Sequence, residues 1–405
     1  MRIIHIADYF QPKLGYQETF LAREHARLGH EVHVITSNRY YPFPKYKETV
    51  GPLLGLRRLS PGMYKEDKVI IHRLQAHFEY RARIWLNGLK NEIEAIQPDV
   101  IYAHGIESIT SFRLARWKRK SPSNCRLIYD CHMVDIVSKS KLGPLFRGIY
   151  KHLLKRSILK AADALVAVSD TTKKYMETVY GIPPYRIQMI PLGVDTETFQ
   201  RNPEIRMEIR SKLGIDPREV VFIYAGKVIP EKGIHLLAKA FQRLLKEVLN
   251  LRLRVLIVGG GPVEYREQIM RDISTAGFAE SFIWTGVVPN AELPKYYSAA
   301  DIGVWPKEVS ITQWEAMSCE LPIIVADNPA AAERVAWGNG LVYKEGDVKD
   351  LYRAMKQLLV DENLRREMGQ RSRKIVEERF SWKVIARRFL ELVKDADSIE
   401  GQEEA

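Results

Sequence analysis

Segment 301–326 constrains the fold more than any other part of the chain, because it places a short helical stretch between two buried apolar runs. The runs, 301–305 (DIGVW) and 322–326 (PIIVA), are typical of parallel strands that are covered on both faces, while 312–319 has helical composition. The helix therefore begins at the carboxyl end of a strand. In an open α/β sheet this edge binds ligands, and the free N–H groups of a helix start favour anions.

Two acidic residues belong to this segment: Glu308 lies in the predicted loop and Glu315 about one turn into the helix. Carboxylates repel phosphate, so beside a phosphate cradle they are better suited to accept hydrogen bonds from the hydroxyl groups of a sugar or ribose. The alternative is structural, with Glu308 as a capping acid and Glu315 in a salt bridge. The segment alone leaves both interpretations open.

The segment resembles the nucleotide-sugar signature of the retaining glycosyltransferases of family 4, which are two-domain enzymes of the GT-B architecture. The resemblance rests on Glu315-Ala316-Met317 and on an upstream glutamate. In that family seven residues separate the two glutamates, whereas six separate Glu308 from Glu315, so the family register falls on Lys307. The Gly-Phe-Gly of the family is replaced by Val-Ser-Ile at 309–311.

Strands and helices alternate through both halves of the chain, which predicts an α/β protein of two doubly wound Rossmann-like domains; in the GT-B architecture these face a cleft. A length of 405 residues is sufficient for two cores. Residues 1–200 are expected to form an N-terminal acceptor-side domain and 201–380 a nucleotide-sugar donor domain. The resemblance implies that a helix over 381–394 returns to the first domain. The acidic segment 395–405 is predicted to be a disordered tail.

Two stretches of the first half carry weaker patterns. Residues 38–68 are rich in Tyr, Pro, Gly and Lys without a clear period, which predicts a long irregular insertion. Residues 84–96 are predicted to form a helix.

A strand-to-helix crossing at 226–233 (GKVIPEKG) carries the strongest phosphate signal. Lys227 and Lys232 can hold a diphosphate as point charges, and the glycine at each end lets the backbone approach it. Gly260 lies in a further glycine run, which suits either an open slot for a base and its ribose or a simple turn. The family form has Gly-Arg where Lys227 stands; lysine keeps the charge but loses the bidentate fork.

In the N-terminal half, Gly15 ends a loop before a predicted helix and resembles the glycine loop of the family. His104 and His132 each follow a predicted strand, where a histidine can bond a ligand hydroxyl or relay a proton, or can be purely structural. The resemblance favours His132, because it aligns with a histidine that contacts the transferred sugar.

The resemblance thus implies His132 and Glu308 as catalytic residues and no metal or other cofactor, since lysines and a helix start would stabilise the leaving diphosphate. There is no Walker pattern and no GxGxxG after the first strand, which argues against nucleotide hydrolysis and dinucleotide redox chemistry. The implied donor-binding residues are Gly15, Lys227, Lys232, Gly260, Ser310, Ile311, Thr312 and Glu315.

A net charge of +12 indicates anionic partners. Nucleic acid is the weakest of these, because no zinc-finger, RNA-recognition or basic heptad pattern is present. Segment 139–160 is basic and amphipathic, which predicts peripheral membrane contact; alternatively its apolar face packs on the sheet and its basic face is solvated. Scattered cysteines, no secretory signal and no long apolar run predict a cytoplasmic protein, peripheral on the inner face of the membrane.

The predicted function is transfer of a hexosyl group, with retention, from a nucleotide-diphosphate sugar to an acceptor such as a glycolipid or a cell-envelope polysaccharide precursor. The alternatives are a nucleotide-sugar 2-epimerase of the same architecture and a non-catalytic relative that binds sugars.

Overall fold

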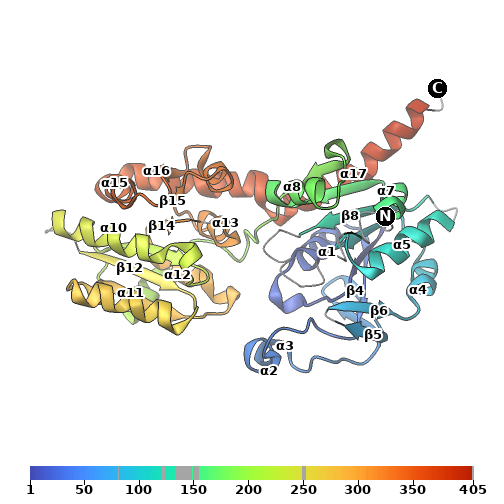
Figure 1. The fold of residues 1–405 in the computed structure, drawn as a ribbon, viewed down its shortest axis with the longest axis horizontal. Helices are drawn as coiled ribbons and strands as arrows, with labels where there is room; N and C mark the ends of the chain where they lie inside the picture. The colour runs from blue at the N-terminus through green and yellow to red at the C-terminus, as the bar shows by residue number, and fades with distance from the viewer. Residues whose placement is uncertain are drawn as a thin grey trace. The chain divides into compact units, whose positions relative to one another are not determined.

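The computed structural model describes residues 1–80, 82–120, 124–132, 148, 155–248, 252–307 and 309–403. The chain forms two compact units, of which unit 1 comprises Met1–Gly193 with Trp382–Ala405, and unit 2 comprises Val194–Ser381 (Figure 1). Each unit contains its own predominantly parallel sheet with helices on its faces, so the prediction of two Rossmann-like α/β domains is confirmed. The junctions at 193/194 and 381/382 lie near the expected 200/201 and 380/381.

The sheet of unit 1 has the order β10-β9-β8-β7-β1-β2-β4-β3, and only β3 is antiparallel to its neighbour. Its central strands are buried along nearly their whole length because they are continuous apolar runs. The chain winds outward from β1 in both directions, so β1 and β7 flank the switch point where such sheets bind ligands. The strands are β1 (Arg2–Ala7), β2 (Glu31–Ser37), β3 (Gly62–Glu66), β4 (Val69–Leu74), β7 (Val100–His104), β8 (Arg126–Cys131), β9 (Ala164–Ala167) and β10 (Ile187–Met189).

The predicted helix over 84–96 is wrong in its first part. Residues Ala76–Tyr80 (β5) and Arg83–Leu86 (β6) form an antiparallel hairpin, and the helix α4 covers only Leu89–Ile96. The burial of Ile84 and Leu86 alternates with exposed Trp85, which is the period of a strand. The stretch 38–68 also contains regular structure: two short helices, α2 (Tyr46–Thr49) and α3 (Gly51–Leu54), and strand β3.

The remaining helices of unit 1 cover both faces of its sheet. They are η1 (Pro12–Leu14), α1 (Gln17–Arg27), α5 (Ile109–Lys120), α7 (Lys155–Ala161), α8 (Asp170–Thr178), η4 (Pro184–Arg186) and α17 (Trp382–Glu403).

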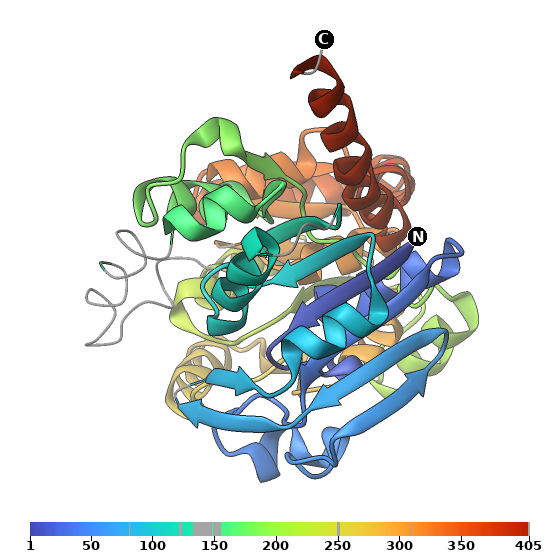
Figure 2. The ribbon, with the colours of Figure 1, turned by 90° about the vertical axis from the view of Figure 1, so that its right-hand side faces the viewer.

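Helix α17 leaves unit 2 in sequence but packs on unit 1, against α1 (Figure 2). The rings of Trp382 and Phe20 stack with centroids 5.2 Å apart, and the Tyr102 hydroxyl donates to the carbonyl of Phe389 at 2.9 Å. A Cβ on Gly193 would lie 2.6 Å from the Trp382 ring, so only glycine fits there. The helix continues to Glu403, and therefore helical backbone occupies most of the segment expected as a disordered tail.

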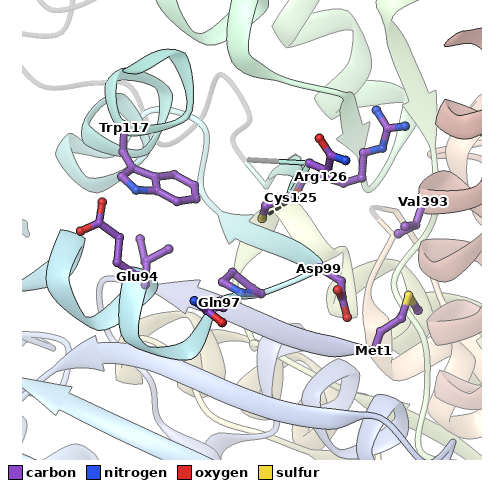
Figure 3. Close-up of a pocket in the computed structure, with 11 residues that line it drawn as sticks. Met1, Glu94, Gln97, Asp99, Trp117, Cys125, Arg126 and Val393 are labelled. Atoms are coloured by element: carbon purple, nitrogen blue, oxygen red, sulfur yellow. Dashed lines mark hydrogen bonds between the residues drawn. The ribbon is translucent and has the colours of Figure 1, made fainter. Parts of the chain in front are cut away.

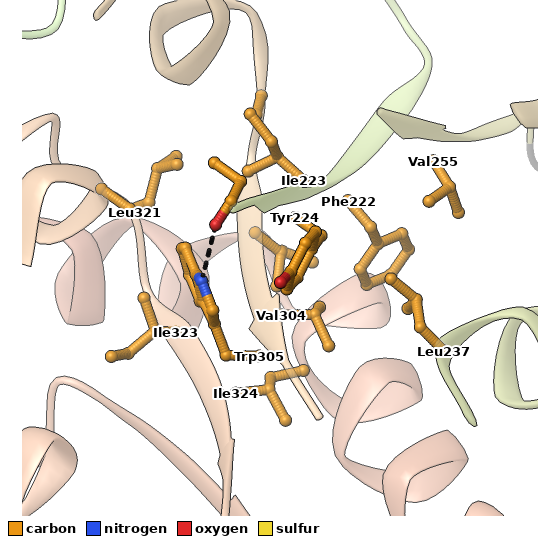
Figure 4. Close-up of a cluster of buried hydrophobic side chains, with 14 of the residues drawn as sticks. Phe222, Ile223, Tyr224, Leu237, Val255, Val304, Trp305, Leu321, Ile323 and Ile324 are labelled. Carbon is orange, nitrogen blue, oxygen red and sulfur yellow. Dashed lines mark hydrogen bonds between the residues drawn. The ribbon is translucent and has the colours of Figure 1, made fainter. Parts of the chain in front are cut away.

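The sheet of unit 2 has the order β13-β12-β11-β14-β15-β16 and is parallel throughout its described ladders. Its core is a single cluster in which the Trp305 indole N–H donates to the Ala225 carbonyl at 3.1 Å and so joins β14 to β11 (Figure 4). The strands are β11 (Val220–Ala225), β12 (Leu253–Val258), β13 (Phe282–Gly286), β14 (Ile302–Trp305), β15 (Ile323–Ala326) and β16 (Gly340–Tyr343).

The helices of unit 2 follow its strands in the expected alternation. They are α9 (Pro203–Lys212), η5 (Pro230–Lys232), α10 (Ile234–Glu247), α11 (Val263–Thr275), η6 (Ala279–Ser281), η7 (Asn290–Glu292), α12 (Leu293–Ala299), α13 (Ile311–Ser318), α14 (Pro329–Ala332), η8 (Glu333–Val335), α15 (Val348–Val360), α16 (Glu362–Ile375) and the π-helical turn η9 (Val376–Phe380).

None of the described helices has the length and apolar character that a membrane span requires. The predicted interfacial helix over 139–160 lies largely outside the described residues; of this stretch the structure describes Gly148 and the first residues of α7.

Candidate functional site

Glycines close the carboxyl edge of the unit 2 sheet, where the ends of β11, β12 and β13 meet. The N–H of Gly226 donates to the Val258 carbonyl, and that of Gly259 to the Gly286 carbonyl, both at 2.9 Å. A Cβ on Gly259 would lie only 1.8 Å from the carbonyl oxygen of Gly226. The backbones touch here, so the glycines are needed for close approach and not only for a turn.

Gly260 lies in the same crossing, where its carbonyl accepts from the N–H of Val228 at 2.9 Å. A side chain at this position would meet Val287 at 2.6 Å. The glycine run therefore leaves bare backbone at the edge where a parallel sheet binds ligands.

Lysines surround the start of α10. The Lys232 ammonium donates to the carbonyl of Val309 at 3.2 Å, which joins the crossing to the loop before α13, and Lys227 is exposed just after β11. Lys307 was not among the predicted site residues, yet its side chain packs at the position where a Cβ on Gly233 would point, 3.0 Å from Lys307 Cγ. Burial and then the charges of Lys307 and Lys239 lower the pKa of His235 in the first turn of α10. This end of α10 is thus strongly positive, as an anion site requires.

The start of α13 is held by its own side chains. Ser310 is the N-cap and forms a capping box with Gln313. The Thr312 hydroxyl donates to the Ala225 carbonyl at 2.8 Å and accepts from the Trp305 indole at 3.1 Å. The hydroxyl groups of Ser310 and Thr312 thus form hydrogen bonds within the protein. Together with Ile311, these residues can therefore bind a ligand through the backbone N–H groups of the first helical turn.

Glu315 is buried on α13 and accepts hydrogen bonds from the Asn290 amide at 2.9 Å and the Tyr297 hydroxyl at 3.3 Å. Within the described part of the chain no cation pairs with it, so the salt-bridge interpretation does not apply there. Burial raises the pKa of Glu315 to about 7, although both hydrogen bonds oppose the shift. A buried carboxyl group without a counter-ion is a candidate for binding hydroxyl groups.

The raised pKa of Glu315 predicts a pH dependence of stability. Between its ordinary pKa of 4.5 and about 7, the folded state holds a proton that the unfolded state has lost, so the free energy of unfolding falls as pH rises. The loss should total about 3 kcal/mol. In urea unfolding at pH 5 and pH 8, the loss of stability between the two pH values should be smaller by about this amount in Glu315→Gln than in the parent and in the exposed control Glu367→Gln. Equal losses in the parent and in Glu315→Gln would contradict the shift.

Glu308 lies outside the described residues, so its place beside Lys307 stays a prediction. Gly15 is described: it ends η1 with φ +68°, and a side chain there would lie 3.3 Å from the ring of Phe20 in α1. Gly15 thus directs the chain into α1. The first residue of this helix, Gln17, donates to Asp130, which belongs to a second group of polar side chains.

That second group lies at the carboxyl edge of the unit 1 sheet. His132 Nε2 lies 3.4 Å from Asp130 Oδ1, and His104 Nδ1 lies 2.5 Å from Asp130 Oδ2. The two histidines that the sequence offered as alternatives are therefore bound to one carboxylate. Burial lowers the pKa of His132, but Asp130, followed by Glu18 and Glu107, outweighs it and raises that pKa above its usual value.

Sequence reasoning missed the carboxyl groups around this histidine pair. Burial raises the pKa values of Glu18 and Glu107, and it raises that of Asp8 to about 7 even though the Thr110 hydroxyl donates to Asp8 at 2.5 Å. The one available signal for Asp130 was a charged residue at the end of the apolar run 126–131. This edge can therefore hold and exchange protons near neutral pH.

Ligand atoms of His104, Asp130 and His132 all lie within 4.8 Å of one another, which is close enough to consider a metal. However, both ring nitrogens of His104 are hydrogen-bonded, Nδ1 to Asp130 and Nε2 to His5 at 3.0 Å. Neither has a lone pair to give without breaking a bond, so the group fits an ion pair better than a metal centre.

A cavity of about 720 Å³ opens at the other edge of unit 1, where β1, β7 and β8 begin. Trp117 and Glu94 line one side, and Met1 and Val393 the other (Figure 3). None of the predicted site residues lines this cavity.

Comparison with known proteins agrees with this geometry. Residues 205–375 match the family described as "Glycosyl transferases group 1", and residues 19–198 match "Glycosyltransferase Family 4". The glycine crossing and α13 of unit 2 thus fall within one matched region, and His104, Asp130 and His132 of unit 1 within the other.

Among curated relatives, the GDP-mannose-dependent alpha-(1-6)-phosphatidylinositol monomannoside mannosyltransferase of Mycolicibacterium smegmatis is 30% identical over 59% of this chain, and the match spans 64% of that relative's length. The D-inositol 3-phosphate glycosyltransferase of Kineococcus radiotolerans is 25% identical over 93% of this chain and 88% of its own.

The structure of Anabaena HepE in complex with UDP superposes with a TM-score of 0.69 at 16% identity, covering 98% of this chain and all of that one. This likeness concerns the fold. Since family matches cover both units and the fold is that of GT-B glycosyltransferases, the chain belongs to the glycosyltransferases of family 4.

Proposed function

We propose that the protein transfers a hexosyl group, with retention, from a nucleotide-diphosphate sugar to an acceptor hydroxyl. The observation that carries the proposal is the glycine crossing at Gly226 and Gly259, which bares the backbone beside the positive start of α10. Two relatives support the class of donor: the mannosyltransferase of M. smegmatis depends on GDP-mannose, and HepE has been solved with UDP.

In this proposal Lys227, Lys232 and the start of α10 hold the diphosphate, and their charges stabilise the leaving group without a metal. Glu315 accepts hydrogen bonds from ribose hydroxyls, Glu308 from the donor sugar, and His132 from a sugar hydroxyl. The bare backbone at 259–261 lies at the sheet edge that the base would approach.

The acceptor is proposed to be a lipid-linked polyol of the cell envelope, reached from the cytoplasmic side with segment 139–160 against the membrane. The name of one relative supports the lipid-linked polyol, since its acceptor is a phosphatidylinositol mannoside, and that of another supports a polyol without lipid, an inositol phosphate. Sedimentation with anionic vesicles at low salt should carry the protein down, and high salt should release it. Protein that stays in the supernatant at low salt would refute membrane contact.

One experiment tests the activity itself. Nucleotide release from a panel of nucleotide-diphosphate sugars is measured with and without a lipid extract. A glycosyltransferase releases much more nucleotide with the extract than without it. A 2-epimerase isomerises the donor without an acceptor. A non-catalytic relative binds a donor but carries out neither reaction. Retention is then read from the anomeric configuration of the product by NMR.

Lys232→Ala is expected to weaken binding of the nucleotide diphosphate by ~1.5–3 kcal/mol, the range for a hydrogen bond to a charged group. The control Lys246→Ala removes the same charge from an exposed position in the last turn of α10, far from the proposed diphosphate, and should cost far less. Lys227→Arg should be tolerated, since it adds a bidentate fork. Calorimetry measures all three, and parent-like affinity in Lys232→Ala would refute the diphosphate assignment.

A further inference from the structure

Three histidines of unit 1 form a continuous hydrogen-bonded chain behind Asp130. His25 Nε2 lies 3.1 Å from the carbonyl oxygen of Ala386 in α17, and His25 Nδ1 lies 3.1 Å from His5 Nε2. His5 Nδ1 lies 3.0 Å from His104 Nε2, and His104 Nδ1 lies 2.5 Å from Asp130. His5 and His25 have no exposed surface, so the chain is closed to water along its length.

The number of protons in this chain follows from its two ends. A backbone carbonyl only accepts, so His25 must carry its proton on Nε2 and direct it at Ala386. The chain has four hydrogen bonds and therefore needs four protons, whereas three neutral imidazoles supply three. The fourth proton makes one histidine an imidazolium as long as Asp130 is ionised.

Asp130 is kept ionised by its other donors. The Gln17 amide donates to it at 2.9 Å and the Gly105 N–H at 3.1 Å, in addition to the two histidines. Burial opposes ionisation, but the charges and hydrogen bonds of His104 and His132 outweigh it and hold the pKa of Asp130 well below its usual value.

The fourth proton belongs at the Asp130 end of the chain, where His104 touches the carboxylate. Burial, followed by the neighbouring histidines, lowers the pKa of His5 far below its usual value, and burial lowers that of His25 to about 3. Both therefore stay neutral with their proton on Nε2, so His104 Nε2 must donate to His5 Nδ1, and the fourth proton lies in the contact between His104 Nδ1 and Asp130.

We propose that His5, His25 and His104 are positioning residues that fix His132 in one tautomer, with Nε2–H directed at Asp130 and Nδ1 left as the nitrogen that meets the substrate hydroxyl. His104 already donates to Asp130 Oδ2, so His132 Nε2–H donates to the other carboxylate oxygen, Oδ1. The His132 side chain is 39% exposed, in contrast to His5 and His25. The charged groups that act on His132 are Asp130, Glu18 and Glu107. Only the identity of the hydroxyl rests on the proposed function.

The test reads the tautomers directly. In the full-length protein with ¹⁵N-labelled histidine, long-range ¹H–¹⁵N correlation distinguishes protonated from bare ring nitrogens, and single His→Gln variants assign the signals. Above the titration midpoint of His132 we expect a proton on Nε2 in His5, His25 and His104, and a bare Nδ1 on His132. A bare Nε2 on His104 or on His132 would overturn the proposal.

Two substitutions of His25 distinguish its role in orienting His132 from its role in packing the core of unit 1. His25→Gln can accept from His5 through its carbonyl and donate to Ala386 through its amide, so it keeps the direction of the chain, whereas His25→Leu removes both bonds. We expect the leucine variant to change the titration midpoint of His132 and to lower kcat roughly tenfold, in the range seen when a partner that orients a functional histidine is lost. The glutamine variant should restore both.

If the leucine variant keeps the parent's His132 titration while thermal unfolding shows it folded, the positioning role is refuted. The NMR readout needs no substrate, so it decides this proposal even if no nucleotide sugar is turned over. Absence of turnover in the parent would count against the proposed function alone.

Discussion

Asp130→Asn is expected to lower the free energy of unfolding of unit 1 by ~3–5 kcal/mol and to remove most of the turnover, because it removes the buried carboxylate that binds His104 and His132. The asparagine amide cannot accept from Gln17, Gly105, His104 and His132 as a carboxylate does. Wherever its NH₂ group points, it faces a donor.

The pH dependence of this effect has a definite sign. The pKa of Asp130 is lower in the folded protein than its ordinary value of 3.8, so its contribution to stability is complete above that value and disappears as pH falls through the lowered pKa. The difference between parent and Asp130→Asn should therefore be largest near neutral pH and shrink in acid.

Hydrogen exchange of peptides from β7 and β8 measures the effect on unit 1 in the intact chain. Asp170→Asn serves as the control, because this exposed acid in the first turn of α8 makes the same change of charge without buried donors. Parent-like protection and turnover in Asp130→Asn would contradict the role of the carboxylate.

Gly259→Ala is expected to destabilise unit 2 by at least ~4 kcal/mol, since the new methyl group would lie 1.8 Å from the Gly226 carbonyl oxygen at φ +143°. Backbone, not a flexible side chain, stands in the way, so β11 and β12 must separate at the proposed binding edge. Donor binding should be lost together with stability.

Gly277→Ala is the control that separates the two costs of Gly259→Ala, the steric clash and the strain of a positive φ. Gly277 also has a positive φ, +79°, but nothing lies within 4 Å of its added Cβ. This control should cost only the left-handed conformation, about 1–2 kcal/mol. Denaturant unfolding of both variants gives the comparison, and equal costs would show that the crossing relaxes freely.

The strands were predicted well where both faces of the sheet are buried. There, as at β14 and β15, every residue of the strand is apolar, and the sequence shows an uninterrupted apolar run. The prediction failed at β6, because Ile84, Trp85 and Leu86 are all apolar while only two of them are buried. Hydrophobicity does not distinguish an outward-facing tryptophan from a core residue, and so the period of two was hidden.

The residues of the candidate sites also differ in how far the sequence could predict them. Glu315 and the lysines stood out because they lie within short, dense motifs. The histidine chain had no such signal: its bonds join residues 20, 99 and 361 positions apart. Histidine is also as common on surfaces as in cores, so nothing local indicates that His5 and His25 are buried.

The return of α17 to unit 1 has a consequence for biosynthesis. Residues 194–381 are contiguous, so unit 2 can complete its core as it leaves the ribosome, whereas one of the two core clusters of unit 1 waits for Ile385 and Phe389, which are translated after all of unit 2. At ~5–20 residues per second, the first half of the protein spends ten seconds or more with the α17 face of its sheet uncovered. The part that is made first is thus finished last, and a nascent chain stalled before α17 would present Ile3, Leu21 and Tyr102 to chaperones.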